Sequence, residues 1–319
     1  MNLIPATQPT LYFIGVTTAS SMIMNVFPRW AEFLGLNDAV IKGIDLKLHD
    51  EPARYREVVD FIKQDPLSRG ALVTTHKLDL FHAASDIFDE IDFYAKLMGE
   101  TSCISKRGNK LICHAKDPIS SGLTIDGFMP NNHFNTTKAD AFIIGAGGSA
   151  IAISWHLMMS LEKQNRPTRL FIADRDAERL NHIREIHSKA KTTVPITYHL
   201  VDRAEDNDAI IAKLPAGSLI VNATGLGKDA PGSPITDDVS FPEHAIIWEL
   251  NYRGDLVFLD QAKAQHTARH LQIEDGWIYF IHGWTQVIGE VFDVAIPTEG
   301  PVFDEISKLA GQTSGARSK

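Results

Sequence analysis

The stretch Ala141-Phe-Ile-Ile-Gly-Ala-Gly-Gly-Ser-Ala150 decides how this sequence folds. Its four leading apolar residues predict a buried strand, and the Gly-x-Gly-x-x-Ala pattern that follows leads into an apolar helix. The first glycine of such a turn permits a tight bend, and the second lets the backbone approach a pyrophosphate. The helix N-terminus offers that group free N–H donors and a positive dipole. We therefore predict a dinucleotide-binding loop made by Gly145, Ala146, Gly147, Gly148, Ser149 and Ala150.

The next predicted strand, at 169–173, is followed directly by a carboxylate, Asp174. An acid at that point accepts hydrogen bonds from the ribose hydroxyls of an adenosine, and it repels the 2′-phosphate of NADP. The sequence thus favours NAD as cofactor, with NADP as the alternative because the neighbouring Arg175 can pair with that phosphate. Two other interpretations of the loop stay open. One is a methyltransferase with a similar glycine loop and acid, and the other is a tight turn selected for packing alone.

Two later segments also point to a ligand. The strand at 219–221 runs into a polar turn, and such turns at the carboxyl ends of parallel strands are where ligands sit in open α/β sheets. Gly276 precedes a large apolar run, so its backbone could approach a nicotinamide ring, although an ordinary core helix explains it equally well. We add to the predicted cofactor contacts Asn222, Ala223, Thr224, Gly225 and Gly276.

Strand and helix patterns alternate on both sides of the glycine loop, which predicts two α/β units with parallel sheets. The exception is 102–115, where two short strands around Arg107-Gly-Asn109 predict a hairpin. In the second unit we predict strands at 141–144, 169–173, 199–201, 219–221 and 245–250. Beyond Asp260 the pattern is mostly helical, and the tail at 311–319 is expected to fray.

Composition excludes several classes of protein. The 319 residues are 44% hydrophobic and 22% charged, with a net charge of -9, which argues against general nucleic-acid binding. Cys103 and Cys113 lack metal-ligand spacing, so we expect neither a zinc site nor a disulfide framework. The N-terminus lacks the features of a signal peptide, and no apolar run reaches the roughly 18 residues of a membrane span. These features predict a cytoplasmic protein without a metal and without a membrane partner.

Seven short motifs occur in an order that resembles the shikimate/quinate dehydrogenase family. They are a loop at 15–21, VTTHK at 73–77, GETSC at 99–103, AKD at 115–117, GAGGSA at 145–150, NATGLG at 222–227 and ELNY at 249–252. The resemblance implies a discontinuous N-terminal α/β substrate domain, residues 1–118 rejoined by helices at 277–319. It also implies a Rossmann-type domain with a doubly wound parallel sheet at 119–276, and an active site between the domains. The implied activity is NAD(P)-dependent oxidation of an alcohol, as in aromatic amino acid biosynthesis.

Carried over by motif, Lys77 corresponds to the family's catalytic lysine and Asp117 to its partner aspartate. Hydride transfer from a secondary alcohol requires loss of the hydroxyl proton, and a lysine beside a carboxylate can hold that hydroxyl and relay the proton. Asp117 is followed by Pro118, so a role at a helix start is an alternative compatible with catalysis.

The substrate-holding residues depart from the family pattern. Only Ser21 remains of a serine pair, and Thr74 and Thr75 stand where the family has a proline. Ser102 replaces an asparagine, and Ala115 and Lys116 replace an asparagine and a threonine. A site that hydrogen-bonds ring hydroxyls discriminates differently when these partners change, so the preferred substrate need not be shikimate. The predicted substrate contacts are Ser21, Thr18, Thr74, Thr75, Ser102, Tyr252 and Gln286.

The leading hypothesis is therefore a dehydrogenase that acts on a small cyclic hydroxy acid: shikimate, quinate or a relative. The alternatives are another Rossmann oxidoreductase with a different small substrate and a non-catalytic module that senses NAD. A sensor has no need of Lys77 and Asp117. The only expected ligands are the cofactor and a small molecule; the assembly is left open, with a homodimer as one alternative.

Overall fold

The computed structural model describes residues 3–159, 165–228 and 230–314. It has two compact units: unit 1 comprises Met1–Lys116 and Ile281–Lys319, and unit 2 comprises Asp117–Phe280. Each unit holds one six-stranded sheet with helices, so the predicted α/β class is confirmed. The units divide after residues 116 and 280, whereas the sequence prediction placed these boundaries after 118 and 276.

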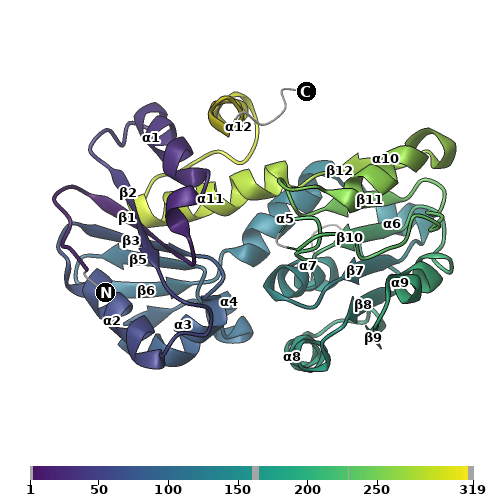
Figure 1. The fold of residues 1–319 in the computed structure, drawn as a ribbon, viewed down its shortest axis with the longest axis horizontal. Helices are drawn as coiled ribbons and strands as arrows, with labels where there is room; N and C mark the ends of the chain where they lie inside the picture. The colour runs from purple at the N-terminus through teal and green to yellow at the C-terminus, as the bar shows by residue number, and fades with distance from the viewer. Residues whose placement is uncertain (1–2, 160–164, 229, 315–319) are drawn as a thin grey trace. The chain divides into compact units, whose positions relative to one another are not determined.

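Unit 1 carries a mixed sheet in the order β2-β1-β3-β5-β6-β4 (Figure 1). Its strands are β1 (Thr10–Gly15), β2 (Val40–Asp45), β3 (Ser68–Val73), β4 (Glu90–Ile91), β5 (Cys103–Arg107) and β6 (Lys110–His114). Its helices are α1 (Ile23–Phe33), α2 (Pro52–Gln64), α3 (Lys77–Ala84), α4 (Phe93–Met98) and α12 (Pro301–Ser314), with 3-10 turns η1 (Thr18–Ser20) and η2 (Ser85–Ile87). β1, β2 and β3 run parallel, and β5 pairs antiparallel with β3. β5 and β6 form the predicted antiparallel hairpin.

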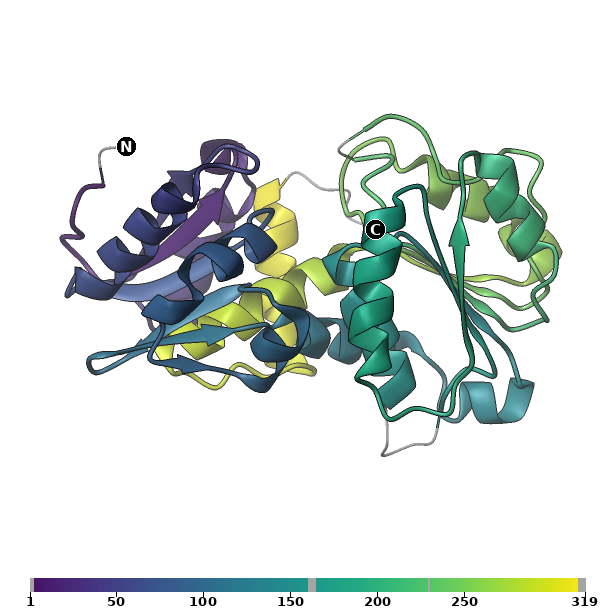
Figure 2. The same ribbon diagram turned by 90° about the horizontal axis from the view of Figure 1, so that it is seen from below.

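Unit 2 carries a parallel sheet in the order β12-β11-β10-β7-β8-β9, with helices on both faces (Figure 2). Its strands are β7 (Ala141–Ile144), β8 (Leu170–Asp174), β9 (Ile196–Leu200), β10 (Leu219–Asn222), β11 (Ile246–Glu249) and β12 (Gln272–Glu274). Its helices are α5 (Asp117–Phe128), α6 (His133–Thr137), α7 (Gly148–Met159), α8 (Ala177–Ser188), α9 (Ala204–Ile211) and α10 (Val257–Arg269). Helix α11 (Trp277–Phe292) begins in unit 2 and continues in unit 1.

Burial explains why the central strands of unit 2 are apolar up to their last residues, which are Asn222 in β10 and Glu249 in β11. Every residue of β7, β10 and β11 is buried, as expected for parallel strands that are covered by helices on both faces. The chain runs from β7 outward to β8 and β9, then returns to place β10 on the other side of β7. The carboxyl ends of β7 and β10 therefore form the switch point at which open α/β sheets bind ligands.

Four sequence predictions about secondary structure need correction. Strand β12 lies in the region predicted to be helical; it is only three residues long and owes its conformation to pairing with β11. β9 begins three residues earlier than predicted, and β11 covers Ile246–Glu249 rather than 245–250. Residues 311–314 are helical, since they complete α12, which packs on α1; the rest of the predicted frayed tail, 315–319, lies outside the described residues.

Candidate active site

Lys77 lies where β3 leaves the sheet of unit 1. The strand ends at Val73, a short turn follows, and Lys77 is the first residue of α3, with its side chain half-buried. The Lys77 N–H donates to the Thr74 carbonyl at 3.2 Å, and the Lys77 carbonyl accepts the Thr101 N–H at 3.0 Å. The Thr74 hydroxyl donates to the Ile14 carbonyl at 3.2 Å. The lysine backbone is thus fixed at the carboxyl ends of β1 and β3.

Ser102 connects this segment to the one that leads to Asp117. Its carbonyl accepts the Val73 N–H at 2.9 Å, and its own N–H donates to the His114 carbonyl at 3.0 Å. Its buried hydroxyl oxygen accepts the Lys116 N–H at 2.7 Å. The chain segments that carry Lys77 and Asp117 therefore leave the unit 1 sheet at the same edge. Asp117 itself is the first residue of α5 and of unit 2.

Three predicted substrate contacts, Thr18 and Ser21 after β1 and Thr75 after β3, differ in burial and in hydrogen bonding. Thr18 is buried, and both its N–H (2.8 Å) and its hydroxyl (2.6 Å) donate to Asp45 at the end of β2. Its one hydroxyl hydrogen is therefore used inside unit 1. Ser21 is half-buried, with its N–H bonded to the Thr18 carbonyl, while Thr75 is exposed.

The last two predicted substrate contacts lie in different units. Tyr252 follows β11 in unit 2, where its ring packs on Phe280 with a centroid distance of 4.5 Å. Gln286 lies on the unit 1 part of α11, half-buried.

The glycine loop of unit 2 has the shape that a dinucleotide needs. Gly145 has φ +117°, and its N–H donates to the Ala173 carbonyl at 2.6 Å. A Cβ at Gly145 would lie 2.8 Å from the Ala223 carbonyl oxygen, so a side chain is excluded there. A Cβ at Gly147 would meet no atom within 4 Å, which leaves open space above the loop. Helix α7 begins at Gly148, directly beside this space. The residues present therefore fit a pyrophosphate.

Asp174, the last residue of β8, also holds the glycine loop in place through a hydrogen bond. Its buried carboxylate accepts the Ala146 N–H at 2.7 Å with one oxygen and the Asp176 N–H at 2.9 Å with the other. A carboxylate has about four lone-pair sites, so acceptor capacity is left for a ribose hydroxyl. Arg175 is exposed. This structural role of Asp174 was not predicted, because the hydrogen bond joins residues at the ends of two different strands.

The turn after β10 is held by side chains from two strand ends. The Asn222 side-chain oxygen accepts the Thr224 N–H at 3.1 Å and the Thr224 hydroxyl at 2.6 Å. The Asn222 amide donates to the Glu249 carboxylate at 2.7 Å, and Glu249 also accepts the Asn251 N–H at 2.8 Å. The Asn251 amide donates to the carbonyls of Thr224 and Leu226 at 3.2 and 3.1 Å. Glu249 and Asn251 were not predicted as site residues; the available signal was a carboxylate at the end of an otherwise apolar strand.

Glu249 makes the stability of unit 2 depend on pH. Burial raises its pKa from 4.5 to about 7, against the lowering effect of the Asn251 and Asn222 donors. Because the folded state binds the proton more tightly than the unfolded chain, this group stabilises the fold most below about pH 4.5. Its contribution falls by roughly 3 kcal/mol as the pH rises to about 7, and stays constant above that.

This loss of stability should be visible when wild type is compared with a Glu249→Gln variant. The free energy of unfolding of wild type minus that of Glu249→Gln should fall between pH 4.5 and 7, because the glutamine cannot ionise. Denaturant titrations at half-unit pH steps measure it. A difference that stays flat across this range would contradict the assignment.

Within residues 3–159, 165–228 and 230–314, no group of three or more His, Cys, Asp or Glu side chains could hold a metal ion. In the same ranges no helix combines the length and apolar character needed to cross a membrane.

Comparison with known proteins gives sequence relatives over about half of the chain. No family model matches. A shikimate dehydrogenase (NADP(+)) of Symbiobacterium thermophilum is 27% identical over 167 residues, which cover 52% of this chain and 52% of that protein. A shikimate dehydrogenase (NADP(+)) of Rhodopseudomonas palustris is 29% identical over 178 residues, covering 53% of this chain and 58% of that protein. The chain thus spans little more than half the length of these curated relatives.

Solved structures match along nearly the whole chain. Quinate dehydrogenase from Corynebacterium glutamicum in complex with NAD has a TM-score of 0.71 at 18% identity, covering 95% of this chain and 98% of that one. Shikimate 5-dehydrogenase from Thermus thermophilus, in complex with NADP(H) and shikimate, has a TM-score of 0.67 at 20% identity, covering 95% and 99%. The 5-ketofructose reductase of a Gluconobacter strain scores 0.67 at 16% identity, covering 96% and 99%. These three proteins share the fold described above.

Proposed function

The chain belongs to the shikimate/quinate dehydrogenase-like family, and we propose that it is a nicotinamide-dependent dehydrogenase acting on a small cyclic hydroxy acid. The reaction would exchange a hydride between the cofactor and a ring hydroxyl or ketone of that acid. The proposal depends on one observation: at one edge of the unit 1 sheet, hydrogen bonds of Ser102 join the chain segment before Lys77 to the segment before Asp117.

The nucleotide would be held by unit 2. The loop at 145–150 would take the pyrophosphate, Asp174 the adenosine ribose, and the Asn222–Gly225 turn a part nearer the nicotinamide. The open space above Gly147 and the start of α7 beside it support this assignment. A bound nicotinamide would supply the hydride acceptor or donor.

Lys77 and Asp117 would handle the proton that accompanies the hydride. In the oxidation, the Lys77 Nζ takes the proton from the substrate hydroxyl oxygen as the C–H hydride leaves and the carbonyl forms. In the reduction, the Lys77 ammonium returns the proton to the same oxygen. The Asp117 carboxylate would orient the hydroxyl by accepting its hydrogen bond or that of the lysine.

The proposed substrate is a class of compounds rather than a single acid. Shikimate and quinate dehydrogenases share this fold, and so does a 5-ketofructose reductase, so the fold is compatible with several polyhydroxylated substrates. The buried Ser102, whose oxygen already accepts the Lys116 N–H, replaces the asparagine of the family motif. We therefore keep shikimate, quinate and their relatives as one substrate class.

A reduction assay tests the proposal. Purified protein with NAD or NADP and a panel of cyclic hydroxy acids should produce the absorbance of reduced nicotinamide with at least one acid. Turnover only with substrates outside this class would favour another Rossmann oxidoreductase. Saturable NAD binding without turnover on any panel would favour a sensing module and defeat the proposal.

For the cofactor we propose NAD, because a buried anionic Asp174 opposes a 2′-phosphate. Asp174→Asn is expected to raise the ratio of NADP to NAD affinity about tenfold, since a charge that repels the phosphate is removed. Affinity for both cofactors should fall, because an asparagine oxygen can accept only one of the two N–H bonds that Asp174 accepts from Ala146 and Asp176. Fluorescence titration of both reduced cofactors measures the ratio.

Asp176→Asn is the matched control. Asp176 caps α8 through the Glu178 N–H at 2.8 Å, and asparagine caps helices equally well. This variant should leave the ratio unchanged. A wild-type protein that already binds NADP about tenfold more tightly than NAD would instead assign the specificity to Arg175.

A further inference from the structure

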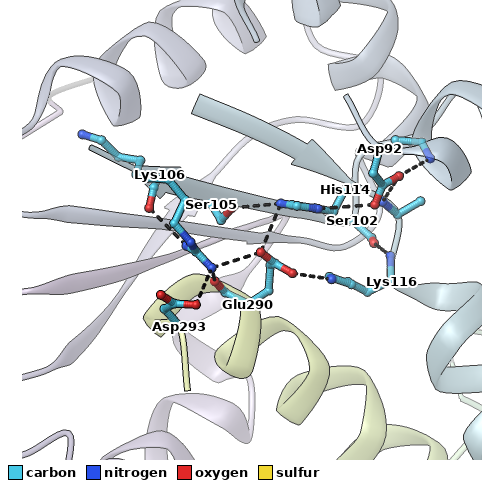
Figure 3. Close-up of polar contacts among 11 residues, drawn as sticks. Asp92, Ser102, Ser105, Lys106, His114, Lys116, Glu290 and Asp293 are labelled. Carbon is cyan, nitrogen blue, oxygen red and sulfur yellow. Dashed lines mark hydrogen bonds and ion pairs between the residues drawn. The ribbon is translucent and has the colours of Figure 1, made fainter. Parts of the chain in front are cut away.

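Glu290, on the unit 1 part of α11, is the centre of a charge network that the sequence motifs did not indicate. Its carboxylate accepts the Lys116 Nζ at 2.7 Å and the Arg107 Nη2 at 3.1 Å, and the His114 Nε2 lies 3.6 Å away. Arg107 also donates to the Glu290 backbone carbonyl at 2.6 Å. Figure 3 shows the Glu290 carboxylate reaching from its helix toward Lys116 and His114.

The network holds its charges in a poorly solvated place. The side chain of Lys116 is 12% exposed and that of Glu290 24%. Burial alone would raise the pKa of Glu290, but Lys116, His114 and Arg107 outweigh it, so the pKa is lowered and the carboxylate stays ionised. An ammonium this buried depends on its anion, because leaving one charge of such a pair unpaired is strongly unfavourable.

The same network fixes the three residues before Asp117. Lys116 is held at two points, its N–H by the Ser102 hydroxyl oxygen and its Nζ by Glu290. His114 lies between Ser105, 2.9 Å from its Nε2, and Asp92, 3.3 Å from its Nδ1. Asp92 also accepts the Ala115 N–H at 3.4 Å. Every residue of 114–116 is thus tied to another part of unit 1, as Figure 3 shows for His114 and Lys116.

We propose that Glu290 is a positioning residue for Asp117: through Lys116 it fixes the backbone from which that carboxylate projects. The inference rests on the proposed function, in which Asp117 orients the substrate hydroxyl. It also explains the departure of this chain from the family motif at 115–117. A lysine at 116 in place of a threonine requires an anion, and residue 290, which lies 174 positions further along the chain, supplies it.

Glu290→Gln tests the proposal. The amide keeps the shape and one hydrogen-bond acceptor but loses the charge that holds Lys116. We expect kcat to fall about tenfold while KM for the nicotinamide cofactor stays the same, because a small misplacement of a catalytic group slows chemistry more than binding. A smaller fraction of folded protein would also lower the apparent kcat at constant KM, so kcat is calculated per active site, from a titration of the cofactor-binding sites in each preparation.

Asp293→Asn is the matched control. Asp293 contacts the same Arg107, at 3.4 Å, but its side chain is 81% exposed, so water screens its charge. It should leave kcat unchanged. A fall of kcat in Asp293→Asn equal to that in Glu290→Gln would overturn the proposal, since the effect would then belong to Arg107.

A double-mutant cycle tests the link itself. Lys116→Met breaks the same contact from its other end, because it removes the cation that the Glu290 carboxylate binds. The double variant should therefore lose no more activity than the more impaired single variant. Losses that multiply would show that the two residues act independently and would defeat the proposal. If Glu290→Gln does not fold, kcat and KM are measured on Lys116→Met alone, and the same fall of kcat at constant KM is expected.

Hydrogen exchange separates this proposal from the proposed function. The Lys116 amide, bonded to Ser102, should exchange faster in Glu290→Gln than in wild type, whatever the substrate is. Absence of dehydrogenase activity in the wild type would defeat the proposed function. The positioning of Asp117 by Glu290 would then have no catalytic role, even if the Lys116 amide exchanged faster in Glu290→Gln. Unchanged Lys116 exchange together with wild-type kcat would defeat the positioning role alone.

Discussion

Replacing Lys77 by methionine is expected to lower kcat by ~10²–10⁴-fold, the usual worth of a positioned acid–base group. Methionine keeps the length and apolar stem of the half-buried side chain but cannot take or return a proton. The affinity for the nicotinamide cofactor should stay almost the same, because the glycine loop and Asp174 belong to unit 2 and Lys77 belongs to unit 1. Steady-state kinetics and a cofactor titration on the same preparation measure both quantities.

Lys96→Met is the control for this substitution. Lys96 is an exposed lysine of the same unit, in the last turn of α4, and it should tolerate methionine without loss of kcat. A folded Lys77→Met protein with full activity on its true substrate would mean that the chain keeps the family's fold and uses another proton-transfer residue.

Gly276→Ala is expected to destabilise unit 2 by about 3 kcal/mol or more. A Cβ at this position would lie 2.0 Å from the Leu250 carbonyl oxygen and 2.8 Å from the Asn251 carbonyl carbon. Both contacts are with backbone, so no side-chain rotation relieves them, and the start of α11 would have to separate from the end of β11. Denaturant unfolding followed by circular dichroism measures the loss.

Gly283→Ala provides the comparison within the same helix. A Cβ there meets no atom within 4 Å, and alanine favours helix over glycine by up to ~1 kcal/mol. We therefore expect equal or slightly greater stability. A Gly276→Ala protein as stable as Gly283→Ala would show that the close approach at Leu250 relaxes without cost.

The prediction for Gly276 illustrates what pattern alone can establish. The glycine before a large apolar run indicated a close approach of the backbone to another group. Such an approach exists, and the group is the backbone of Leu250 and Asn251, directly after β11. The alternative of an ordinary packing role for the helix start is thus supported by a contact. A role toward the nicotinamide stays a prediction.

Local patterns determined most of the fold. The run of strands and helices, the hairpin near Arg107 and the turn at Gly145 each depend on residues close in sequence, so the spacing of apolar and glycine residues was enough to predict them. The exceptions were elements that long-range partners maintain. β12 is a strand because β11 lies beside it. Residues 311–314 stay helical because they complete α12, which is anchored to α1: the Trp30 indole donates to the Ile306 carbonyl at 2.8 Å.

The sequence by itself therefore determined the α/β class, the glycine loop and the candidates Lys77 and Asp117, because each belongs to a short motif. Tertiary structure alone decided which partners hold them. Asp174 binds Ala146 of the glycine loop, 28 residues earlier in the chain, and Glu249 binds Asn222, 27 residues earlier. Glu290 binds Lys116, 174 residues earlier. The physical reason is that buried polar groups must find partners wherever folding places them, and no spacing in the chain encodes that choice.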